Sequence, residues 1–495
     1  MGKKQRHVQL IDTTLRDGQQ SLWATRMTNE MFMPFIGKMD EMGYAAIDLV
    51  GGAVFDVCVR FLHENPWERM RLAAQQVTKT PLGVWTRGQS LFTFEFFADD
   101  IVALTIKRCA ANGMGRISTY DSLNDIRNIE VTVATTKQCG MFVCANIVYT
   151  VSPVHTDQYY VEKILEILKL KPDGVGIKDP SGMLTPERAK TLIPSVRAVM
   201  GKIPLELHSH CRAGLGELVA IEAAALGVDV IYVATSPLSS GASLPDARYV
   251  ISNLNKLGYV LDVDIKDVEL TEAYFSDIAA KYGKPVNGPN RYDPFLFHHQ
   301  IPGGMISNLH SQLKEIELED RFDEVLEEVG RVREDLGYPI LVSPFAQFVV
   351  TQSVMNIAMG ERYKVIPDEV QRYVLGYYGR PAGPINQRVL DRVCRGALQP
   401  MPVDERPGAC VEPQIGTLRK LYGPFESDDD LLLACYYKPA QLTALKRGGD
   451  IASRSPSQAH SGSLSAAQMM TEIRRFPIQK SISVHRPGFS YRGEA

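Results

Sequence analysis

The sequence lacks the segments that would send the chain into or across a membrane. No apolar run approaches the ~18 residues that a membrane-spanning helix needs. The basic start, Met1 to His7, leads directly into VQLIDTTL without the apolar stretch and cleavage site of a signal peptide. Arg6 stands where a myristoylation signal needs Ser or Thr. We therefore expect a soluble, cytoplasmic protein with no membrane partner.

Excess charge and paired cysteines are also missing. Lys and Arg total 54 against 57 acidic residues, a net charge of −3, which gives no electrostatic case for binding nucleic acid. The eight cysteines contain no CxxC pair, which argues against a disulfide framework and a cysteine zinc site. With 495 residues, 45% of them hydrophobic, the chain can form about two to four domains, or one large barrel with an appendage.

Short β-rich runs alternate with helical stretches over the first half of the chain. Residues 28–43, 185–200 and 216–227, for example, show apolar side chains at helical spacing. The predicted strands are 8–14, 45–51, 81–87, 116–121, 142–150, 174–179, 204–210 and 229–235. Alternating strands and helices imply a parallel sheet, and eight such units close a TIM barrel. A doubly wound sheet is the alternative, but it would normally carry a Gly-rich phosphate loop where this chain has TLRDGQQS.

The sequence divides into three predicted parts. Residues 1–305 form the TIM barrel with the active site. Residues 306–445, where helical patterns dominate, form a mostly helical C-terminal domain that contributes to the active-site funnel. Residues 446–495 are rich in Ser, Arg and Gly, and we expect a polar, flexible tail.

Reactive side chains follow several strands at their carboxyl ends, where TIM barrels place catalytic groups. Arg16 and Asp17 follow the first strand, Lys178 ends the sixth, and His208 and His210 belong to the seventh. Residues i and i+2 of a strand share a face, so the two imidazoles lie side by side. With one carboxylate they suit Zn, Mn, Co or Fe. The alternative is a pair of hydrogen-bonded core histidines.

Lys178 does not fit a metal site as an ordinary ammonium group, which a divalent cation repels. Either it pairs with its neighbour Asp179, or it reacts with carbon dioxide to give a carbamate, an anionic ligand. The residue types alone leave both possibilities open.

Other side chains at these strand ends could bind an anionic substrate. Arg87 and Arg16 could each hold a carboxylate through two hydrogen bonds, and Gln20 could add an amide donor. Salt bridges are the alternative for any single arginine. Asp56 either orients a neighbour or caps the helix that follows it.

The ordered motifs of the chain resemble one known family. They are IDTTLRDGQQSLWATRM, LVGGAVFDVCVRFLHENPWERM, YDSLNDIRN, YTVSPVHTDQYYVEKI, GIKDPSGMLTP, ELHSHCRAG, HHQIPGGMISNL and YGRPAGPIN. From residue 7 to about 440 the chain resembles the carboxyltransferase domain of pyruvate carboxylase and of the oxaloacetate decarboxylase alpha subunit. Within that family it most resembles the pyruvate-carboxylating subunit of transcarboxylase (methylmalonyl-CoA carboxytransferase). The chain starts at the carboxyltransferase domain, and its tail has no Met-Lys-Met biotin site.

The resemblance implies a role for each motif residue. The implied metal ligands are Asp17, His208, His210 and Lys178, with the lysine present as N6-carboxylysine. The implied metal is Co, Zn or Mn. Arg87 corresponds to the catalytic arginine that binds the pyruvate carboxylate, while Gln20 and Arg16 correspond to neighbours that contact pyruvate or the metal shell. Asp56 corresponds to an aspartate beside the biotin pocket.

Four positions depart from the family pattern. Ser343 stands where the family has a catalytic Thr, and its hydroxyl can still move a proton at the biotin pocket. Ala346 replaces a Ser that contacts biotin there. Phe94 replaces a Tyr, and Tyr232 replaces an Asp.

The implied reaction is carboxyl transfer between carboxybiotin and pyruvate, with oxaloacetate as the product. The implied partners are a separate biotin carrier subunit, an acyl-CoA carboxyltransferase subunit and a second copy of the chain in a homodimer. Oxaloacetate decarboxylase or pyruvate carboxylase is the alternative context.

A lyase or synthase related to hydroxymethylglutaryl-CoA lyase is a second alternative, because such enzymes share the Arg-Asp-Gly start and the HxH strand. It differs at Lys178 and lacks the helical extension. A scaffold subunit with a decayed site is disfavoured by the intact metal motifs.

Overall fold

The computed structural model describes residues 6–286, 288–301, 306, 309–310, 313–314, 316, 318–396, 398–402, 404–447, 482–486 and 489–493. Contacts within the chain divide it into two compact units. The first comprises Met1–Thr150, Thr156–Asp293 and Val411–Ser453, and the second comprises Val151–His155, Pro294–Cys410 and the described residues after 453. Each unit is described on its own below.

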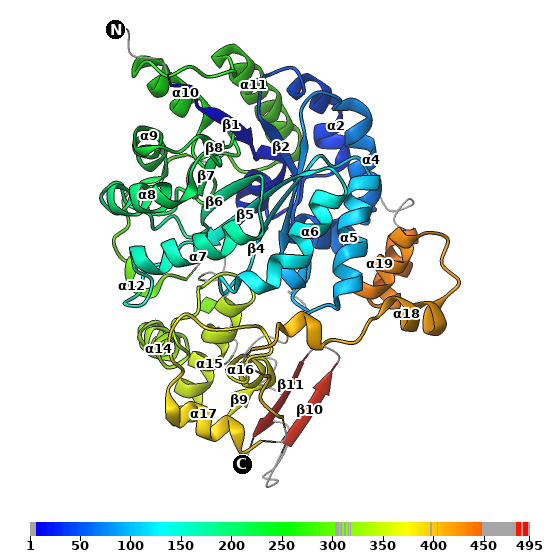
Figure 1. The fold of residues 1–495 in the computed structure, drawn as a ribbon, viewed down its shortest axis with the longest axis vertical. Helices are drawn as coiled ribbons and strands as arrows, with labels where there is room; N and C mark the ends of the chain where they lie inside the picture. The colour runs from blue at the N-terminus through cyan, green and yellow to red at the C-terminus, as the bar shows by residue number, and fades with distance from the viewer. Residues whose placement is uncertain are drawn as a thin grey trace. The chain divides into compact units, whose positions relative to one another are not determined.

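Eight parallel strands form a closed barrel in the first unit (Figure 1). They are β1 (Gln9–Asp12), β2 (Ala46–Val50), β3 (Leu82–Arg87), β4 (Arg116–Tyr120), β5 (Phe142–Val148), β6 (Gly174–Asp179), β7 (Leu205–Ser209) and β8 (Val230–Val233). Strand β1 closes the barrel by pairing with both β2 and β8. The TIM barrel and its eight strands predicted from the sequence are thus confirmed.

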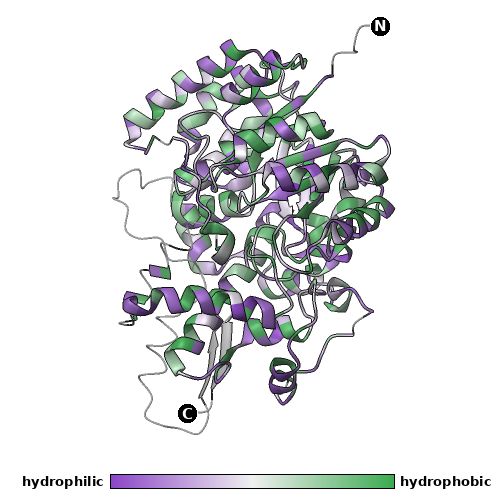
Figure 2. Ribbon diagram, turned by 90° about the vertical axis from the view of Figure 1, so that its left-hand side faces the viewer, coloured by the Kyte–Doolittle hydropathy of each residue, from purple (hydrophilic) through white to green (hydrophobic). Residues whose placement is uncertain are grey.

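Helices surround the barrel and cover its outer face (Figure 1). They are α2 (Asn29–Met39), α3 (Gly52–Val57), α4 (Pro66–Gln76), α5 (Asp99–Ala111), α6 (Glu130–Gln138), α7 (Asp157–Lys169), α8 (Pro186–Met200), α9 (Gly216–Leu226), α10 (Ala247–Lys256) and α11 (Ile265–Tyr282). In α7 the buried side chains are Tyr160, Ile164 and Ile167, which recur at helical spacing. Figure 2 shows the same alternation of apolar and polar residues along the helices.

The segment after β1 is helical, although the sequence predicted only the strand before it. It forms a π-helical turn, Thr14–Gly18, that leads into α1 (Gln19–Leu22). The Asp12 carboxylate accepts hydrogen bonds from the Thr14 backbone N–H at 3.0 Å and from its hydroxyl at 2.8 Å. The backbone N–H of Asp17 donates to the Thr13 carbonyl at 2.9 Å. These bonds fix the position of Asp17 directly after the strand.

The chain returns to the barrel unit near its C-terminal end. Residues 411–453 include α18 (Ile415–Tyr422), α19 (Asp428–Tyr436) and α20 (Pro439–Arg447), whereas the sequence placed them in the helical domain. Buried polar contacts attach α19 to the barrel unit. The Asp429 carboxylate on α19 accepts hydrogen bonds from Arg71 on α4 and from Arg108 and Asn112 at the end of α5. A local sequence pattern does not reveal this pairing.

The second unit is mostly helical in its described residues and also contains strands. Its helices are α12 (Leu296–His299), α14 (Phe322–Asp335), α15 (Phe345–Met359), α16 (Asp368–Val374) and α17 (Gln387–Cys394). Strands β9 (Ile366–Pro367), β10 (Ile482–Arg486) and β11 (Phe489–Gly493) form an antiparallel sheet, so part of the predicted tail is strand. Residues 448–481, and much of the HHQIPGGMISNL motif, lie outside the described residues.

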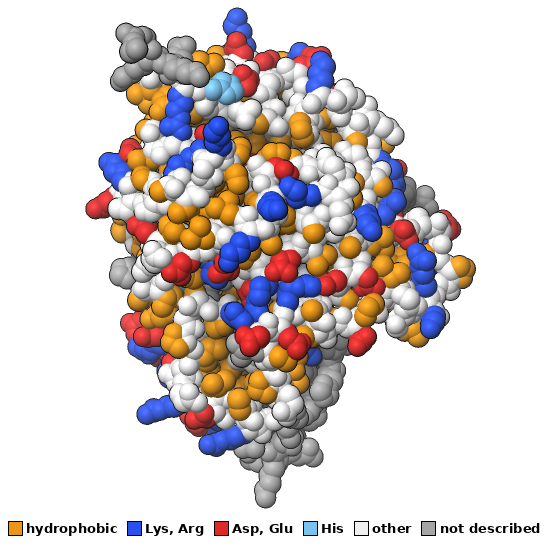
Figure 3. Space-filling model, in the orientation of Figure 1, with side chains coloured by type: hydrophobic (Ala, Val, Ile, Leu, Met, Phe, Trp, Pro, Cys, Tyr) orange, Lys and Arg blue, Asp and Glu red, His pale blue; other side chains and the backbone are white. Residues whose placement is uncertain are grey.

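Among the described residues, no helix is long and apolar enough to cross a membrane. On the face drawn in Figure 3, basic and acidic side chains are interspersed. This distribution agrees with the small net charge of the sequence.

Candidate active site

Three predicted metal ligands meet at the carboxyl end of the barrel strands. Asp17, His208 and His210 each offer one ligand atom, and these atoms lie within 4.8 Å of one another. The Asp17 Oδ2 atom is 2.9 Å from His208 Nε2, 3.6 Å from His210 Nε2 and 4.0 Å from Lys178 Nζ. All four side chains are buried. One carboxylate oxygen therefore faces the nitrogen atoms of the other three predicted ligands.

Positive charge around Asp17 keeps its carboxyl group ionised. Burial alone would raise the pKa of Asp17, but Arg16 and His210 lower it well below its usual range. The Arg16 guanidinium donates to Asp17 Oδ2 directly. Burial, together with the charge of Lys178, lowers the pKa of His208 well below its usual value, so this imidazole is neutral. An ionised carboxylate and a neutral imidazole are the protonation states that a metal ligand requires.

The second imidazole has the tautomer that a metal site needs. His210 Nδ1 lies 2.8 Å from the carbonyl oxygen of Ala242, and a carbonyl only accepts, so Nδ1 carries the proton. The other ring nitrogen, Nε2, faces Asp17 Oδ2 at 3.6 Å and is the atom that would bind a metal. Orientation of a ligand imidazole through its other ring nitrogen is common in metal proteins. The residues present thus fit a divalent transition metal.

Lys178 lies inside this cluster rather than beside it. Its Nζ atom is 3.0 Å from His208 Nε2, and burial lowers the pKa of the amine to about 7. Asp179 is not its partner, because the Asp179 carboxylate accepts hydrogen bonds from the backbone of Met183 and Leu184 and from the Ser209 hydroxyl. Of the two possibilities left open by the sequence, the structure therefore disfavours a Lys178–Asp179 pair.

Two consecutive glycines make room for the predicted arginines. A Cβ atom added at Gly51 would lie 2.5 Å from Arg16 Nε, and one at Gly52 would lie 2.9 Å from Arg87 Cζ. Both distances are shorter than an ordinary contact, so these positions need glycine for close approach. The Gly-Gly pair thus lets the two guanidinium groups lie against the start of α3.

Arg87 projects from the end of β3. Its Nη1 atom donates to the Thr93 carbonyl at 2.5 Å, and its guanidinium carbon lies 4.8 Å from the centroid of the Phe94 ring. The Phe94 ring is 46% exposed and has no hydroxyl to offer a substrate. This departure from the family pattern leaves a cation–π contact on Arg87.

The remaining predicted residues of this unit are less closely connected. Gln20 has a buried amide oxygen with no hydrogen-bond partner in the described part of the chain. Asp56 accepts a hydrogen bond from Arg60 at 3.2 Å, and burial raises the pKa of its carboxyl group.

Ser343 and Ala346 belong to the second unit. Ser343 immediately precedes Pro344 and α15, and its hydroxyl lies 3.4 Å from the Gln347 amide nitrogen. Ala346 is fully buried in the first turn of this helix.

Sequence reasoning missed buried residues that share a strand face with the predicted site residues. Trp85 lies two positions before Arg87 on β3, and the Lys178 Nζ atom is 4.3 Å from the centroid of its ring. Glu206 lies two positions before His208 on β7 and pairs with Arg116. Because side chains alternate along a strand, these residues share the inward face. That alternation is the signal that could have found them.

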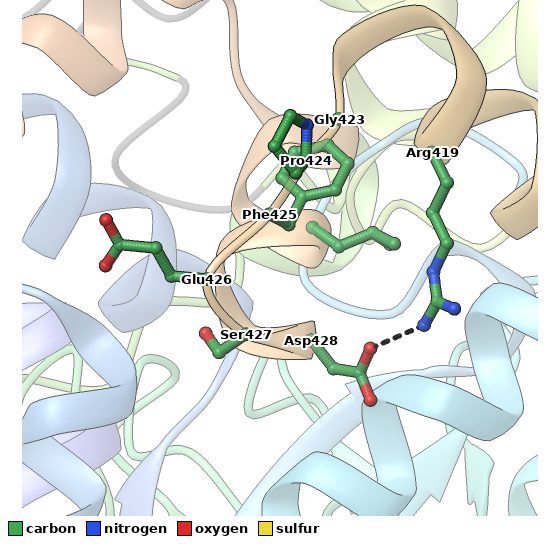
Figure 4. Close-up of a pocket in the computed structure, with 8 residues that line it drawn as sticks. Arg419, Gly423, Pro424, Phe425, Glu426, Ser427 and Asp428 are labelled. Carbon is green, nitrogen blue, oxygen red and sulfur yellow. Dashed lines mark hydrogen bonds and ion pairs between the residues drawn. The ribbon is translucent and has the colours of Figure 1, made fainter.

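A cavity of about 450 Å³ lies elsewhere in the same unit, at α18 and α19 (Figure 4). Its lining includes Arg419 and Asp428, which form a 3.0 Å ion pair. None of the predicted site residues lines it.

The fold and the cluster together define the class of protein: a (β/α)8-barrel enzyme with its polar site at the carboxyl ends of the strands. Solved structures agree on the fold. The carboxyl transferase domain of Rhizobium etli pyruvate carboxylase with pyruvate has a TM-score of 0.81 and 24% identity, over 90% of this chain and 78% of that one. The full pyruvate carboxylase chain, in its T882A form with acetyl coenzyme A, has a TM-score of 0.82 but is matched over only 44% of its length.

The sequence comparisons identify the family. A family model described as HMGL-like matches residues 7–273, and one described as a conserved carboxylase domain matches residues 296–477. A pyruvate carboxylase subunit of Methanocaldococcus jannaschii is 38% identical over 89% of this chain and 78% of its own. The methylmalonyl-CoA carboxyltransferase 5S subunit of Propionibacterium freudenreichii subsp. shermanii is 32% identical over 97% of this chain and 94% of its own length. The 2-oxoglutarate carboxylase large subunit of Hydrogenobacter thermophilus is 36% identical over 81% of this chain and 61% of its own length.

The chain belongs to the family of biotin-dependent carboxyltransferases that contains these subunits. The model that matches residues 296–477 is described as a conserved carboxylase domain, which agrees with the carboxyltransferase prediction rather than with the lyase or synthase alternative.

Proposed function

We propose that this protein transfers a carboxyl group between carboxybiotin, supplied by a separate carrier subunit, and pyruvate, to form oxaloacetate. The observation that carries the proposal is the buried cluster in which Asp17 faces Lys178, His208 and His210. Its position at the carboxyl end of a barrel of this family supports a catalytic role.

The cluster would hold Co, Zn or Mn through Asp17, His208, His210 and Lys178. A bound divalent metal acts as a Lewis acid and stabilises negative charge that develops on an enol oxygen. The identity of the metal depends partly on supply, because imidazole and carboxylate ligands accept all three.

Lys178 is proposed to be N6-carboxylysine. Its neutral amine would attack carbon dioxide, forming a carbamate and releasing one proton, and the product is an anionic ligand in place of an ammonium group. Its burial between a carboxylate and an imidazole supports this assignment, since an ammonium group would compete with the metal.

Arg87 would hold the carboxylate of pyruvate through two hydrogen bonds, with Gln20 as an additional donor. Binding at two points orients the methyl group and turns a chance encounter into an oriented reaction. Arg16 acts through Asp17, to which its guanidinium is bound. Asp56 is proposed to border the biotin pocket, together with Ser343 and Ala346.

Ser343 is the proposed proton carrier. Carboxybiotin loses carbon dioxide, the resulting biotin enolate takes a methyl proton of pyruvate through the Ser343 hydroxyl, and the enolpyruvate attacks the carbon dioxide. Atoms balance, because the proton leaves pyruvate for biotin and the carboxyl group moves the opposite way. Ala346 has no hydroxyl, so the hydroxyl contact with biotin that the family makes at this position is absent.

The proposed partners are the biotin carrier, an acyl-CoA carboxyltransferase subunit and a second copy of this chain, acting in the cytoplasm. A relative that is a methylmalonyl-CoA carboxyltransferase 5S subunit, 32% identical to this chain, supports the transcarboxylase context, while one that is a pyruvate carboxylase subunit, 38% identical, supports the alternative. Pyruvate carboxylase or oxaloacetate decarboxylase is the alternative context, and the half-reaction on pyruvate is the same in each.

The test is a transfer assay with a biotinylated carrier, pyruvate and the purified protein. We expect oxaloacetate from wild type and none from Ser343→Ala, because the variant has no hydroxyl to carry the proton. The matched control is Ser353→Ala in α15, the helix that follows Ser343, because the Ser353 hydroxyl donates to the Val349 carbonyl within that helix. Equal activity of Ser343→Ala and wild type would contradict the role of Ser343. Carboxylation of 2-oxoglutarate instead of pyruvate would contradict the substrate.

A further inference from the structure

The two histidines of the cluster are held in different ways. His210 donates from Nδ1 to the Ala242 carbonyl, as ligand imidazoles commonly do. His208 is fully buried, and its Nδ1 atom has no hydrogen-bond partner in the part of the chain that the structure describes. Another feature must therefore orient the His208 ring.

Two aromatic rings flank His208 inside the barrel. The centroid of Trp85 lies 4.9 Å from the imidazole centroid at an interplanar angle of 60°, and that of Tyr232 lies 5.0 Å away at 62°. Both are edge-to-face contacts, a geometry that aromatic pairs prefer. Trp85 and Tyr232 also lie 5.6 Å from each other. The three rings are mutual neighbours, contributed by β7, β3 and β8.

The two flanking rings are themselves fixed by buried polar groups. The Trp85 indole N–H donates to the Asp48 carboxylate at 2.6 Å. The Tyr232 hydroxyl donates to Glu206 at 2.8 Å and accepts from Arg116, which lies 3.1 Å away. Because Glu206 and Arg116 form an ion pair inside the barrel, the tyrosine ring has a rigid support.

Trp85 also contacts other groups of the site. The Lys178 Nζ atom lies 4.3 Å from its ring centroid, and the Arg16 guanidinium carbon lies 5.4 Å away. One indole therefore touches a ligand imidazole, the lysine of the cluster and the arginine that binds Asp17.

We propose that Trp85 and Tyr232 are positioning residues that hold the His208 imidazole as a metal ligand, in place of the hydrogen bond that its Nδ1 atom does not make to any described residue. This inference rests on the metal site of the proposed function. It gives a role to Tyr232, which replaces the aspartate of the family pattern.

The test measures Co²⁺ binding to the full chain rather than activity. Tyr232→Leu removes the ring, and we expect its Co²⁺ affinity to fall about 10- to 100-fold, the range for losing the support of a ligand. The visible absorption of bound Co²⁺ should change shape, since the His208 ligand moves. Tyr232→Phe keeps the ring against His208 but loses the hydroxyl that supports it, so its Co²⁺ affinity should fall less than that of Tyr232→Leu.

The matched control is Tyr160→Leu, which removes a buried tyrosine of α7 that stacks on Tyr149. It should lose stability but keep the Co²⁺ affinity and spectrum of wild type. If Tyr232→Leu does not fold, Tyr232→Met replaces it, because methionine fills an irregular space without a ring. Wild-type affinity and spectrum in a folded variant without the Tyr232 ring would overturn the inference. Failure of wild type to bind Co²⁺ would instead overturn the metal site itself.

Discussion

The glycine at position 52 provides a direct test of how Arg87 is placed. In Gly52→Ala the new Cβ would lie 2.0 Å from Arg87 Nη2, 2.9 Å from Arg87 Cζ and 3.0 Å from the Phe92 carbonyl oxygen, against 3.4 Å for an ordinary contact. The backbone cannot move easily, so the guanidinium carbon must shift by about 0.5 Å, and the terminal nitrogen atoms by more. A misplacement of about 1 Å costs about 100-fold in rate. We therefore expect kcat/KM for pyruvate to fall about 10- to 100-fold, or about 1.4–2.7 kcal/mol.

The assay is oxaloacetate formation over a range of pyruvate concentrations with a fixed amount of carboxylated carrier. Because a side-chain end moves and the core does not, unfolding should occur at nearly the same denaturant concentration as in wild type. The control is Gly416→Ala in α18, where an added Cβ meets no atom within 4 Å. A kcat/KM for pyruvate within about threefold of wild type in Gly52→Ala would refute the placement of Arg87 at the substrate carboxylate.

Three further predictions concern other parts of the barrel unit. Gly51→Ala crowds Arg16 instead of Arg87, so metal affinity should fall while KM for pyruvate changes little, as measured by chelator competition and steady-state kinetics. Asp429→Ala removes the buried acceptor of Arg71 and Arg108. The substitution should lower the free energy of unfolding by about 2–3 kcal/mol and speed proteolysis between α18 and α19. An unchanged rate of cleavage there would contradict the attachment of α19 through Asp429. Burial raises the pKa of Asp121 from 3.8 to about 7. Between about pH 4 and about pH 7 the folded state therefore binds more protons at this group than the unfolded state does. The contribution of Asp121 to the free energy of unfolding falls as the pH rises from about 4 to about 7. Asp121→Asn should remove that decline, and urea midpoints at pH 5 and pH 7 would detect it; equal pH dependence in variant and wild type would contradict it.

Much of the barrel could be predicted because its signals are local. Each strand is a short apolar run between helical segments, and His208 and His210 have the spacing that puts two side chains on one face. The convergence of Asp17 and Lys178 with these histidines followed from a general rule about strand ends.

What the sequence did not reveal depends on contacts between distant residues. Arg116 and Glu206 pair across the barrel interior although 90 positions separate them. The attachment of α19 through Asp429 crosses more than 300 positions to Arg108. The helical turn at Thr14–Gly18 depends on the Thr13 carbonyl and on Asp12, and the polar residues there are equally typical of a loop.

The central claim is that the Asp17, Lys178, His208 and His210 cluster supports carboxyl transfer to pyruvate. The most direct measurement uses a carrier loaded with ¹³C-labelled carboxybiotin, with metal content determined on the same samples. The account predicts about one divalent metal per chain and oxaloacetate labelled in the new carboxyl group, with both lost in Lys178→Ala. Labelled oxaloacetate from a Lys178→Ala protein that holds no metal would contradict it.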